Sequence, residues 1–168
     1  MGFWHRTMAG EYFGKISIDI PALINADFCA GACMITFGAV LGKMDLFQLW
    51  ILVTLEVFFY SLNEAIGMVV YQAFDIGGSM VIHTFGAVFG LSATYYFKNK
   101  EAIQKHEWKA VGGYVSQYVA MFGTIFLYLY WPSFNAALCP PLSKHRATIN
   151  TALSIAASCV AAAAYARL

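Results

Sequence analysis

Hydrophobic residues fall into long windows that short polar breaks separate. Five windows of about twenty predominantly apolar residues occupy positions of about 24–42, 46–71, 77–97, 111–131 and 147–166. An α-helix needs about twenty residues to cross a hydrocarbon core of roughly 30 Å. Such a segment must satisfy its backbone hydrogen bonds internally, which a helix does. The pattern therefore predicts an all-α membrane protein with about five transmembrane helices.

The polar breaks indicate how the chain is oriented. Lys and Arg concentrate in short cytoplasmic connections. Alternating crossings place Lys43, Lys98, Lys100, Lys105, Lys109 and Arg167 on one side, and Arg6, Lys15, Lys144 and Arg146 on the other. This bias places residues 98–109 inside the cell. It leaves residues 1–20 as an extracellular-side N-terminal segment before a transmembrane domain at 21–168.

The amino-acid composition supports the membrane class and excludes some classes of binding partner. Hydrophobic residues make up 60% of the chain and charged residues 11%, against roughly 45–50% and 25% in soluble domains. A net charge of +1 gives no electrostatic basis for binding nucleic acid. The four cysteines show no metal-ligand spacing, so no metal or other cofactor is expected. The lipid bilayer is the expected surrounding.

Asp75 and His83 place an ionisable pair in an otherwise apolar run. A charged group at bilayer depth costs roughly 2.5–3.5 kcal/mol on insertion scales, so each needs a partner or a polar pathway. Asp75 precedes two glycines where a helix should begin. It is either an N-cap alone or a cap that also stabilises a cationic solute. His83 lies roughly 12 Å deeper along a helix, and it either lines a pore or bonds a neighbouring helix.

Alternating crossings also bring several unusual residues to the outer side of the membrane. They are Asn25, Asp27, Phe28, Glu64, Asp75, Trp131, Phe134, Asn135 and His145. Phe28 and Phe134 each adjoin a polar residue at a helix end, so their rings are expected to stack across an entrance. Phenyl faces also attract cations. Glu64 is either a helix partner or a cation attractor, and Asp27 and Asn135 are further vestibule candidates.

One seven-residue sequence is repeated within the chain in closely similar form. Residues 36–42, TFGAVLG, recur at 84–90 as TFGAVFG. Both copies carry Gly-xxx-Gly, a spacing that lets two membrane helices approach closely. Glu56 lies deep in the second window without a partner visible in the sequence. We expect it to face protein, with no assigned role.

Several motifs together resemble the Rh-type branch of the ammonium transporter family. They are INADFC (24–29), FGAVLGK (37–43), NE (63–64), GGSM (77–80), IHTFGA (82–87), WPSFN (131–135) and HRA (145–147). The resemblance implies a trimer of helical pores, each built from two inverted repeats of five helices. It implies ammonium or ammonia as substrate, with carbon dioxide as an alternative, in a multi-pass plasma-membrane channel.

The resemblance also assigns roles to residues. It implies a two-phenylalanine gate at Phe28 and Phe134, a recruitment-site acid at Asp75 and the first channel histidine at His83. The partner histidine of the family belongs to a later helix, and Gln117 stands where many relatives carry an inner vestibule acid. The chain is therefore expected to be a partial copy of the pore.

Two rival classes remain alongside transport. A non-conducting truncated subunit would associate with full-length family members and alter their assembly. An intramembrane enzyme using Asp75 and His83 is disfavoured, because no Ser or Cys nucleophile motif and no metal cluster accompanies them. The sequence therefore favours a channel over an enzyme.

Overall fold

The computed structural model describes residues 2–11, 18–97 and 113–165, and its regular elements in these ranges are helices. The predicted all-α fold is confirmed. The chain divides into two compact units, Met1–Val111 and Gly112–Leu168.

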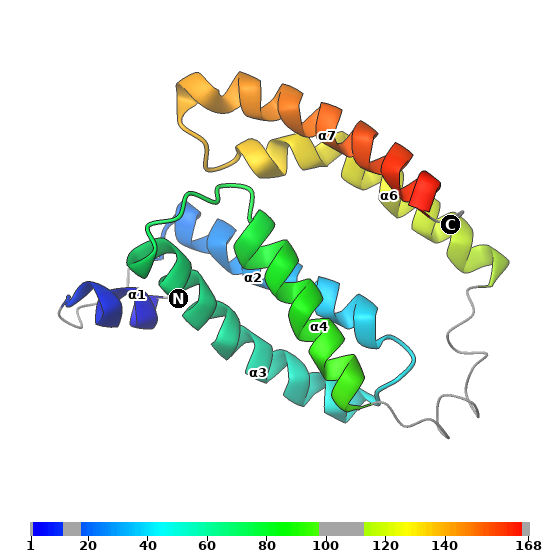
Figure 1. Cartoon of the computed structure of the whole chain (residues 1–168), viewed down its shortest axis with the longest axis horizontal. Helices are drawn as coiled ribbons and strands as arrows, with labels where there is room; N and C mark the ends of the chain where they lie inside the picture. Colours follow the sequence, from blue (N-terminus) through cyan, green and yellow to red (C-terminus); the bar gives the residue numbers. More distant parts are fainter. Residues whose placement is uncertain (1, 12–17, 98–112, 166–168) are drawn as a thin grey trace. The chain divides into compact units, whose positions relative to one another are not determined.

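The first unit contains three long helical segments and a short N-terminal helix. Its elements are α1 (Gly2–Ala9), α2 (Ile20–Val40), α3 (Leu46–Ala65), the π-helices η1 (Ile66–Val70) and η2 (Ser79–Thr84), and α4 (Phe85–Tyr96). The helix α2 contacts both α3 and α4, and α1 packs against α3 and η1 (Figure 1). Three of the predicted windows thus become one packed group of helices.

Aspartate caps explain where α2 and α3 begin. The Asp19 side chain accepts a hydrogen bond from Ala22 N at 2.9 Å. Asp45 accepts from Gln48 N at 2.8 Å, and the Gln48 side chain accepts from Asp45 N at 3.1 Å, which completes a capping box. Just after α2, Gly42 has φ +73°, the left-handed conformation typical of helix C-termini. The polar break at 42–45 is therefore a helix end followed by a helix start.

The helices α2 and α4 meet at the second copy of the repeated heptapeptide. A Cβ on Gly86 would lie 2.8 Å from Ala32 O, and one on Gly90 would lie 2.8 Å from Ala39 Cβ. Close backbone approach is therefore confirmed for this copy. The first copy supplies the facing surface on α2, since a Cβ on Gly90 would also lie 3.0 Å from Thr36 Cα. Its own Gly38 takes no part in this contact, because a Cβ there would meet nothing within 4 Å among the described residues. The other glycine of that copy, Gly42, lies beyond the end of α2 and serves the turn.

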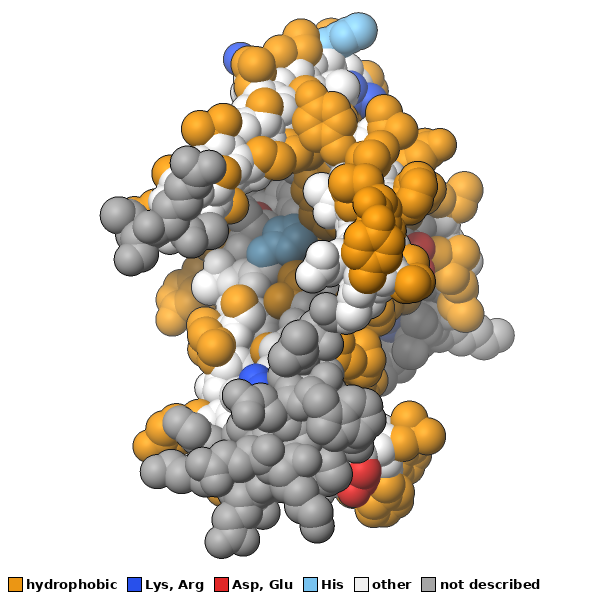
Figure 2. Space-filling model, turned by 90° about the vertical axis from the view of Figure 1, so that its right-hand side faces the viewer, with side chains coloured by type: hydrophobic (Ala, Val, Ile, Leu, Met, Phe, Trp, Pro, Cys, Tyr) orange, Lys and Arg blue, Asp and Glu red, His pale blue; other side chains and the backbone are white. Residues whose placement is uncertain are grey.

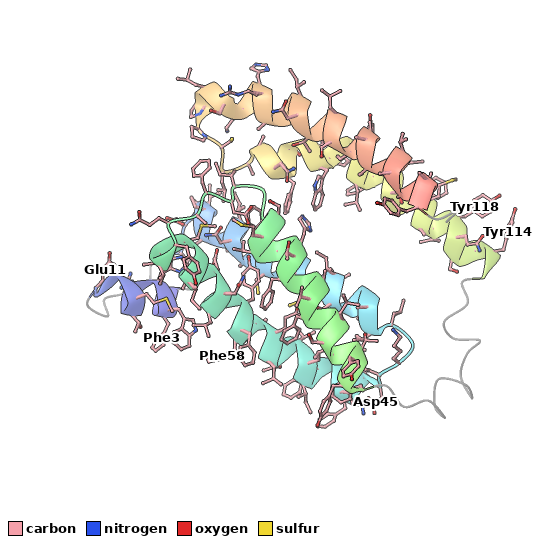
Figure 3. All side chains as sticks on the ribbon, viewed as in Figure 1. Phe3, Glu11, Asp45, Phe58, Tyr114 and Tyr118 are labelled. Carbon is pink, nitrogen blue, oxygen red and sulfur yellow. The ribbon has the colours of Figure 1, made fainter. Side chains whose placement is uncertain are left out.

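Apolar side chains join the three long helices of the first unit. Val40, Leu52 and Ala93 form a buried cluster with one residue from each helix. Farther along α3, Phe58 meets Trp4 on α1 edge-on, with ring centroids 5.4 Å apart. Figure 3 shows Phe58 along α3, well away from Asp45 at its start. Van der Waals packing of this kind holds helices together in lipid.

The second unit is a helical hairpin. Its elements are α6 (Tyr114–Ala136), a short 3-10 helix η4 (Pro141–Ser143) and α7 (Lys144–Tyr165). The helices α6 and α7 run antiparallel and contact each other along their lengths (Figure 1). The Asn135 amide nitrogen donates to Thr151 Oγ1 at 3.1 Å, and this hydrogen bond links the two helices.

Three helical segments are long and apolar enough to cross a membrane: Ile20–Val40, Leu46–Val70 and Pro141–Tyr165. Hydrophobic side chains dominate much of the described surface in Figure 2. These findings confirm the all-α membrane class. The regions 77–97 and 111–131 are largely helical where described, but α4 has 12 residues and α6 does not reach the same hydropathy. Five crossings stay a prediction, and residues 98–109, predicted to lie inside the cell, are outside the described ranges.

Candidate functional site

The Asp75 carboxylate holds the beginning of η2. Its Oδ1 accepts from Ser79 N at 2.9 Å and from Ser79 Oγ at 3.0 Å. Its Oδ2 accepts from Met80 N at 2.8 Å and from Val81 N at 2.9 Å. The side chain is 8% exposed. The capping role predicted for Asp75 is confirmed, and it is more extensive than a single N-cap bond because both oxygens bind backbone amides.

His83 lies on the helical turns that Asp75 fixes. Its backbone N donates to Gly78 O at 3.0 Å, and Gly78 begins the helix with φ +72°. The neighbouring Ile82 is fully buried and lies over Gly31 of α2. The His83 side chain is half-buried. It lies close enough to the Asp75 carboxylate for the two groups to interact electrostatically. The predicted acid and imidazole are therefore joined through one short helix.

Three other predicted site residues belong to the first unit but differ in exposure. Phe28 and Glu64 are each 5% exposed, whereas Asp27 is exposed. Glu64 Oε2 is buried and makes no hydrogen bond within the part of the chain that the structure describes. His5 on α1 is near enough for its charge to act on Glu64. Glu64 thus faces the interior of its own unit, whereas Asp27 faces outward.

Phe134 and Asn135 lie in the second unit, near the end of α6. The Phe134 ring stacks on Trp131, with centroids 4.3 Å apart and planes 13° from parallel. The Asn135 amide nitrogen donates a hydrogen bond to Thr151 across the hairpin. Because Phe28 and Phe134 belong to different units, the pairing of their rings across an entrance stays a prediction. The vestibule role of Asn135 stays a prediction too.

Sequence reasoning missed a buried polar cluster that joins three helices. Thr36 Oγ1 on α2 lies 2.5 Å from Glu56 Oε1 on α3 and 3.0 Å from Gly86 O on α4. Glu56 is fully buried, as is Tyr60 one turn later. The spacing of four between positions 56, 60 and 64 was the available signal, because residues four apart share a helix face. The expectation that Glu56 faces protein is confirmed.

These observations define an α-helical membrane protein with carboxyl, phenol and imidazole groups in its interior. Within the described residues, no three His, Cys, Asp or Glu side chains come together as metal ligands. The family model for the Ammonium Transporter Family matches residues 5–168. The chain therefore belongs to that family.

Similar proteins come from the Rh-type branch. The chain is 45% identical over 161 residues to ammonium transporter Rh type B of Danio rerio, covering 95% of this chain and 34% of that protein. It is 44% identical to Rh type B of Homo sapiens, covering 94% of this chain and 33% of that protein. It is 42% identical to Rh type C of Xenopus laevis, covering 92% of this chain and 32% of that protein. The chain spans about a third of the length of these relatives, and their names confirm the predicted Rh resemblance.

Proposed function

We propose that this chain contributes a pore wall through which ammonium or ammonia crosses a membrane. The observation that carries the proposal is the link between Asp75 and His83. The Asp75 carboxylate binds the amides that begin η2, and His83 lies on the same helix two residues after the last of them. Membership in the Ammonium Transporter Family supports ammonium as the solute class.

The chemistry of these groups suits a small, protonatable amine. A neutral imidazole both donates and accepts hydrogen bonds, so His83 can hold ammonia or take up its proton. Carrying a full charge through a dry constriction is expensive. The proposed sequence is therefore attraction of the cation near the mouth, followed by passage of the solute along hydrogen-bonding groups.

We propose roles along the same solute pathway for the other candidate residues. Phe28 and Phe134 form the aromatic gate, Asp75 is the recruitment acid, and Glu64, Asp27 and Asn135 line the vestibule. Of these, Asp27 is exposed in its unit, which suits a role at the mouth. We further propose that residues 21–168 form the pore-wall domain, that the protein acts as a plasma-membrane trimer, and that carbon dioxide is a second substrate to test.

Vesicles test the proposal directly. The chain is reconstituted into lipid vesicles, an ammonium gradient is imposed, and the internal pH is followed with a trapped dye. With several copies of the chain completing the pore between them, we expect a faster pH change than in empty vesicles, and we expect His83→Ala to slow it towards the rate of empty lipid. His145→Ala is the matched control, because His145 is exposed at the start of α7.

Two outcomes would contradict the proposal. A rate equal to that of empty lipid, with the chain inserted and helical, would remove conduction by this chain and favour the non-conducting subunit. Equal rates for His83→Ala and the unsubstituted chain would remove His83 from the path. Replacing the ammonium gradient by a carbon dioxide gradient in the same vesicles tests the second substrate.

A further inference from the structure

One face of α3 carries three buried groups that can bind or release protons. Glu56 and Tyr60 are each 0% exposed, and Glu64 is 5% exposed. The three positions are four residues apart, so they lie on one face with a rise of about 6 Å between successive groups. We call Glu56, Tyr60 and Glu64 the α3 polar face. Its members belong to α3, whereas His83 belongs to η2.

Hydrogen-bond stoichiometry at Thr36 indicates that Glu56 carries a proton. The Thr36 hydroxyl has one hydrogen, yet its oxygen lies within hydrogen-bond distance of Glu56 Oε1 and Gly86 O. If Glu56 is a neutral acid, its O–H donates to Thr36 Oγ1 and the Thr36 O–H donates to Gly86 O. Both contacts are then satisfied at once, which a single hydroxyl hydrogen and a carboxylate do not achieve.

The surroundings of Glu56 favour the same state. The groups that interact with its carboxyl are Thr36 and the thiol of Cys33, and both are uncharged. No basic side chain of the described residues is among them. A fully buried carboxylate without a counter-charge is far more costly than a neutral acid in the same place.

Each member of the α3 polar face also presents an unpartnered atom. Glu56 Oε2, the Tyr60 hydroxyl and Glu64 Oε2 are buried and meet no described residue in hydrogen-bond geometry, although the Cys33 thiol lies near the Glu56 carboxyl. Leaving a buried polar atom unpaired is costly, and proteins commonly satisfy such atoms with internal water. Three such atoms on successive turns of one helix therefore point to water along that face.

We propose that the α3 polar face is a hydrated proton-binding site, with the proton held on Glu56 and water joining its second oxygen to Tyr60 and Glu64. The ligand is a proton and its accompanying water, and the site goes beyond the proposed passage of ammonium. Besides the face itself, the titratable groups around it are Cys29 and Cys33 on α2, Asp75 before η2 and His5 on α1.

Infrared spectroscopy tests this site without any transport assay. The chain is placed in lipid vesicles at neutral pH without ammonium, and spectra are recorded for the unsubstituted chain and for Glu56→Gln. We expect a carbonyl band of a protonated carboxylic acid that Glu56→Gln abolishes. Glu11→Gln is the matched control, since it makes the same change at an exposed carboxyl outside the α3 polar face and should leave the Glu56 band in place.

Exchange into D₂O tests the water. We expect the Glu56 band to shift to lower frequency within minutes, because water along the face brings exchangeable deuterons to the Glu56 carboxyl group. A spectrum without an acid band, or an acid-band intensity that Glu56→Gln leaves unchanged, overturns the assignment of the proton to Glu56. A Glu56 band that D₂O leaves unshifted overturns the hydrated face.

A second variant covers the case in which Glu56→Gln does not fold. Thr36→Val keeps Glu56 but removes the hydroxyl that accepts its proton, so the acid band should remain and move to higher frequency. An unmoved band in Thr36→Val, with helical content preserved, overturns the hydrogen bond from which the protonation was inferred. None of these outcomes depends on whether the chain conducts ammonium.

Discussion

The Thr36 hydroxyl on α2 lies 3.0 Å from the Gly86 carbonyl oxygen on α4, although 50 residues separate them in the chain. The contact requires the two helix backbones to approach closely. Gly86 permits that approach because it has no Cβ to meet Ala32 O. The hydrogen bond and the glycine that permits it thus lie at the same crossing of α2 and α4.

Gly86→Ala should loosen this crossing. The new Cβ would lie 2.8 Å from Ala32 O and 3.1 Å from Ile35 Cβ, so the helices must shift apart. Overpacking of this kind costs about 1–3 kcal/mol. Denaturant unfolding of the chain in detergent micelles, followed by circular dichroism, measures the loss. Gly38→Ala is the control and should change stability by less than about 0.5 kcal/mol; equal losses in both would contradict the asymmetric packing.

Gly78→Ala should destabilise the start of η2. Gly78 has φ +72°, and a Cβ there would lie 2.1 Å from Ile82 Cδ1. The left-handed conformation alone costs an ordinary residue roughly 1–2 kcal/mol. Gly10→Ala is a control that separates strain from collision, because Gly10 has φ +69° but nothing within 4 Å among the described residues. We expect the larger loss of unfolding free energy at Gly78, and a larger loss at Gly10 would refute it.

Asp75→Asn should weaken the fold even though asparagine is a good N-cap residue. Asp75 uses both oxygens to accept from backbone amides, whereas an asparagine side chain keeps only one acceptor. Loss of capping bonds costs about 0.5–2 kcal/mol. Asp19→Asn is the matched control, because Asp19 caps α2 through a single oxygen. Thermal unfolding in micelles should show a lower midpoint for Asp75→Asn only, and a similar drop in both would be the contrary result.

Thr151→Val should loosen the α6–α7 hairpin. Thr151 is 7% exposed and accepts from the Asn135 amide at 3.1 Å, so valine would leave that donor unpaired. A buried unsatisfied donor costs about 1–3 kcal/mol. Thr148→Val removes a hydroxyl that bonds only Lys144 O within α7, and Thr148 is exposed. The unfolding free energy should fall for Thr151→Val and stay nearly unchanged for Thr148→Val; the reverse order would exclude the inter-helix bond.

Helix positions were predictable because they depend on local sequence. The window at 46–71 corresponds to α3 and η1, which together run from Leu46 to Val70. The apolar run sets the helix, and Asp45 with Gln48 sets its first turn. The capping role of Asp75 was also visible, because aspartate is among the residues preferred at the start of a helix.

The pairing of residues across helices was not predictable. Two identical Gly-xxx-Gly spacings gave the same prediction, yet Gly86 and Gly90 lie at a close crossing whereas Gly38 faces no described atom within 4 Å. In the sequence, Thr36 was recognisable only as the first residue of a repeated heptapeptide. Glu56 was recognisable only as an acid with no visible partner. Their contact depends on how α2 rotates against α3, and no single helix contains that information.

The sequence by itself determined the membrane class, the helical segments, the Rh-type resemblance and the acid that begins η2, because hydropathy and capping act over one or two turns. Only the tertiary structure decided which glycines of the two heptapeptide copies lie at the helix contact, which oxygens Asp75 uses, and which polar groups become buried together. Those outcomes depend on the rotation and close approach of neighbouring helices. In lipid, where apolar surfaces are interchangeable, small residues and specific hydrogen bonds determine that approach.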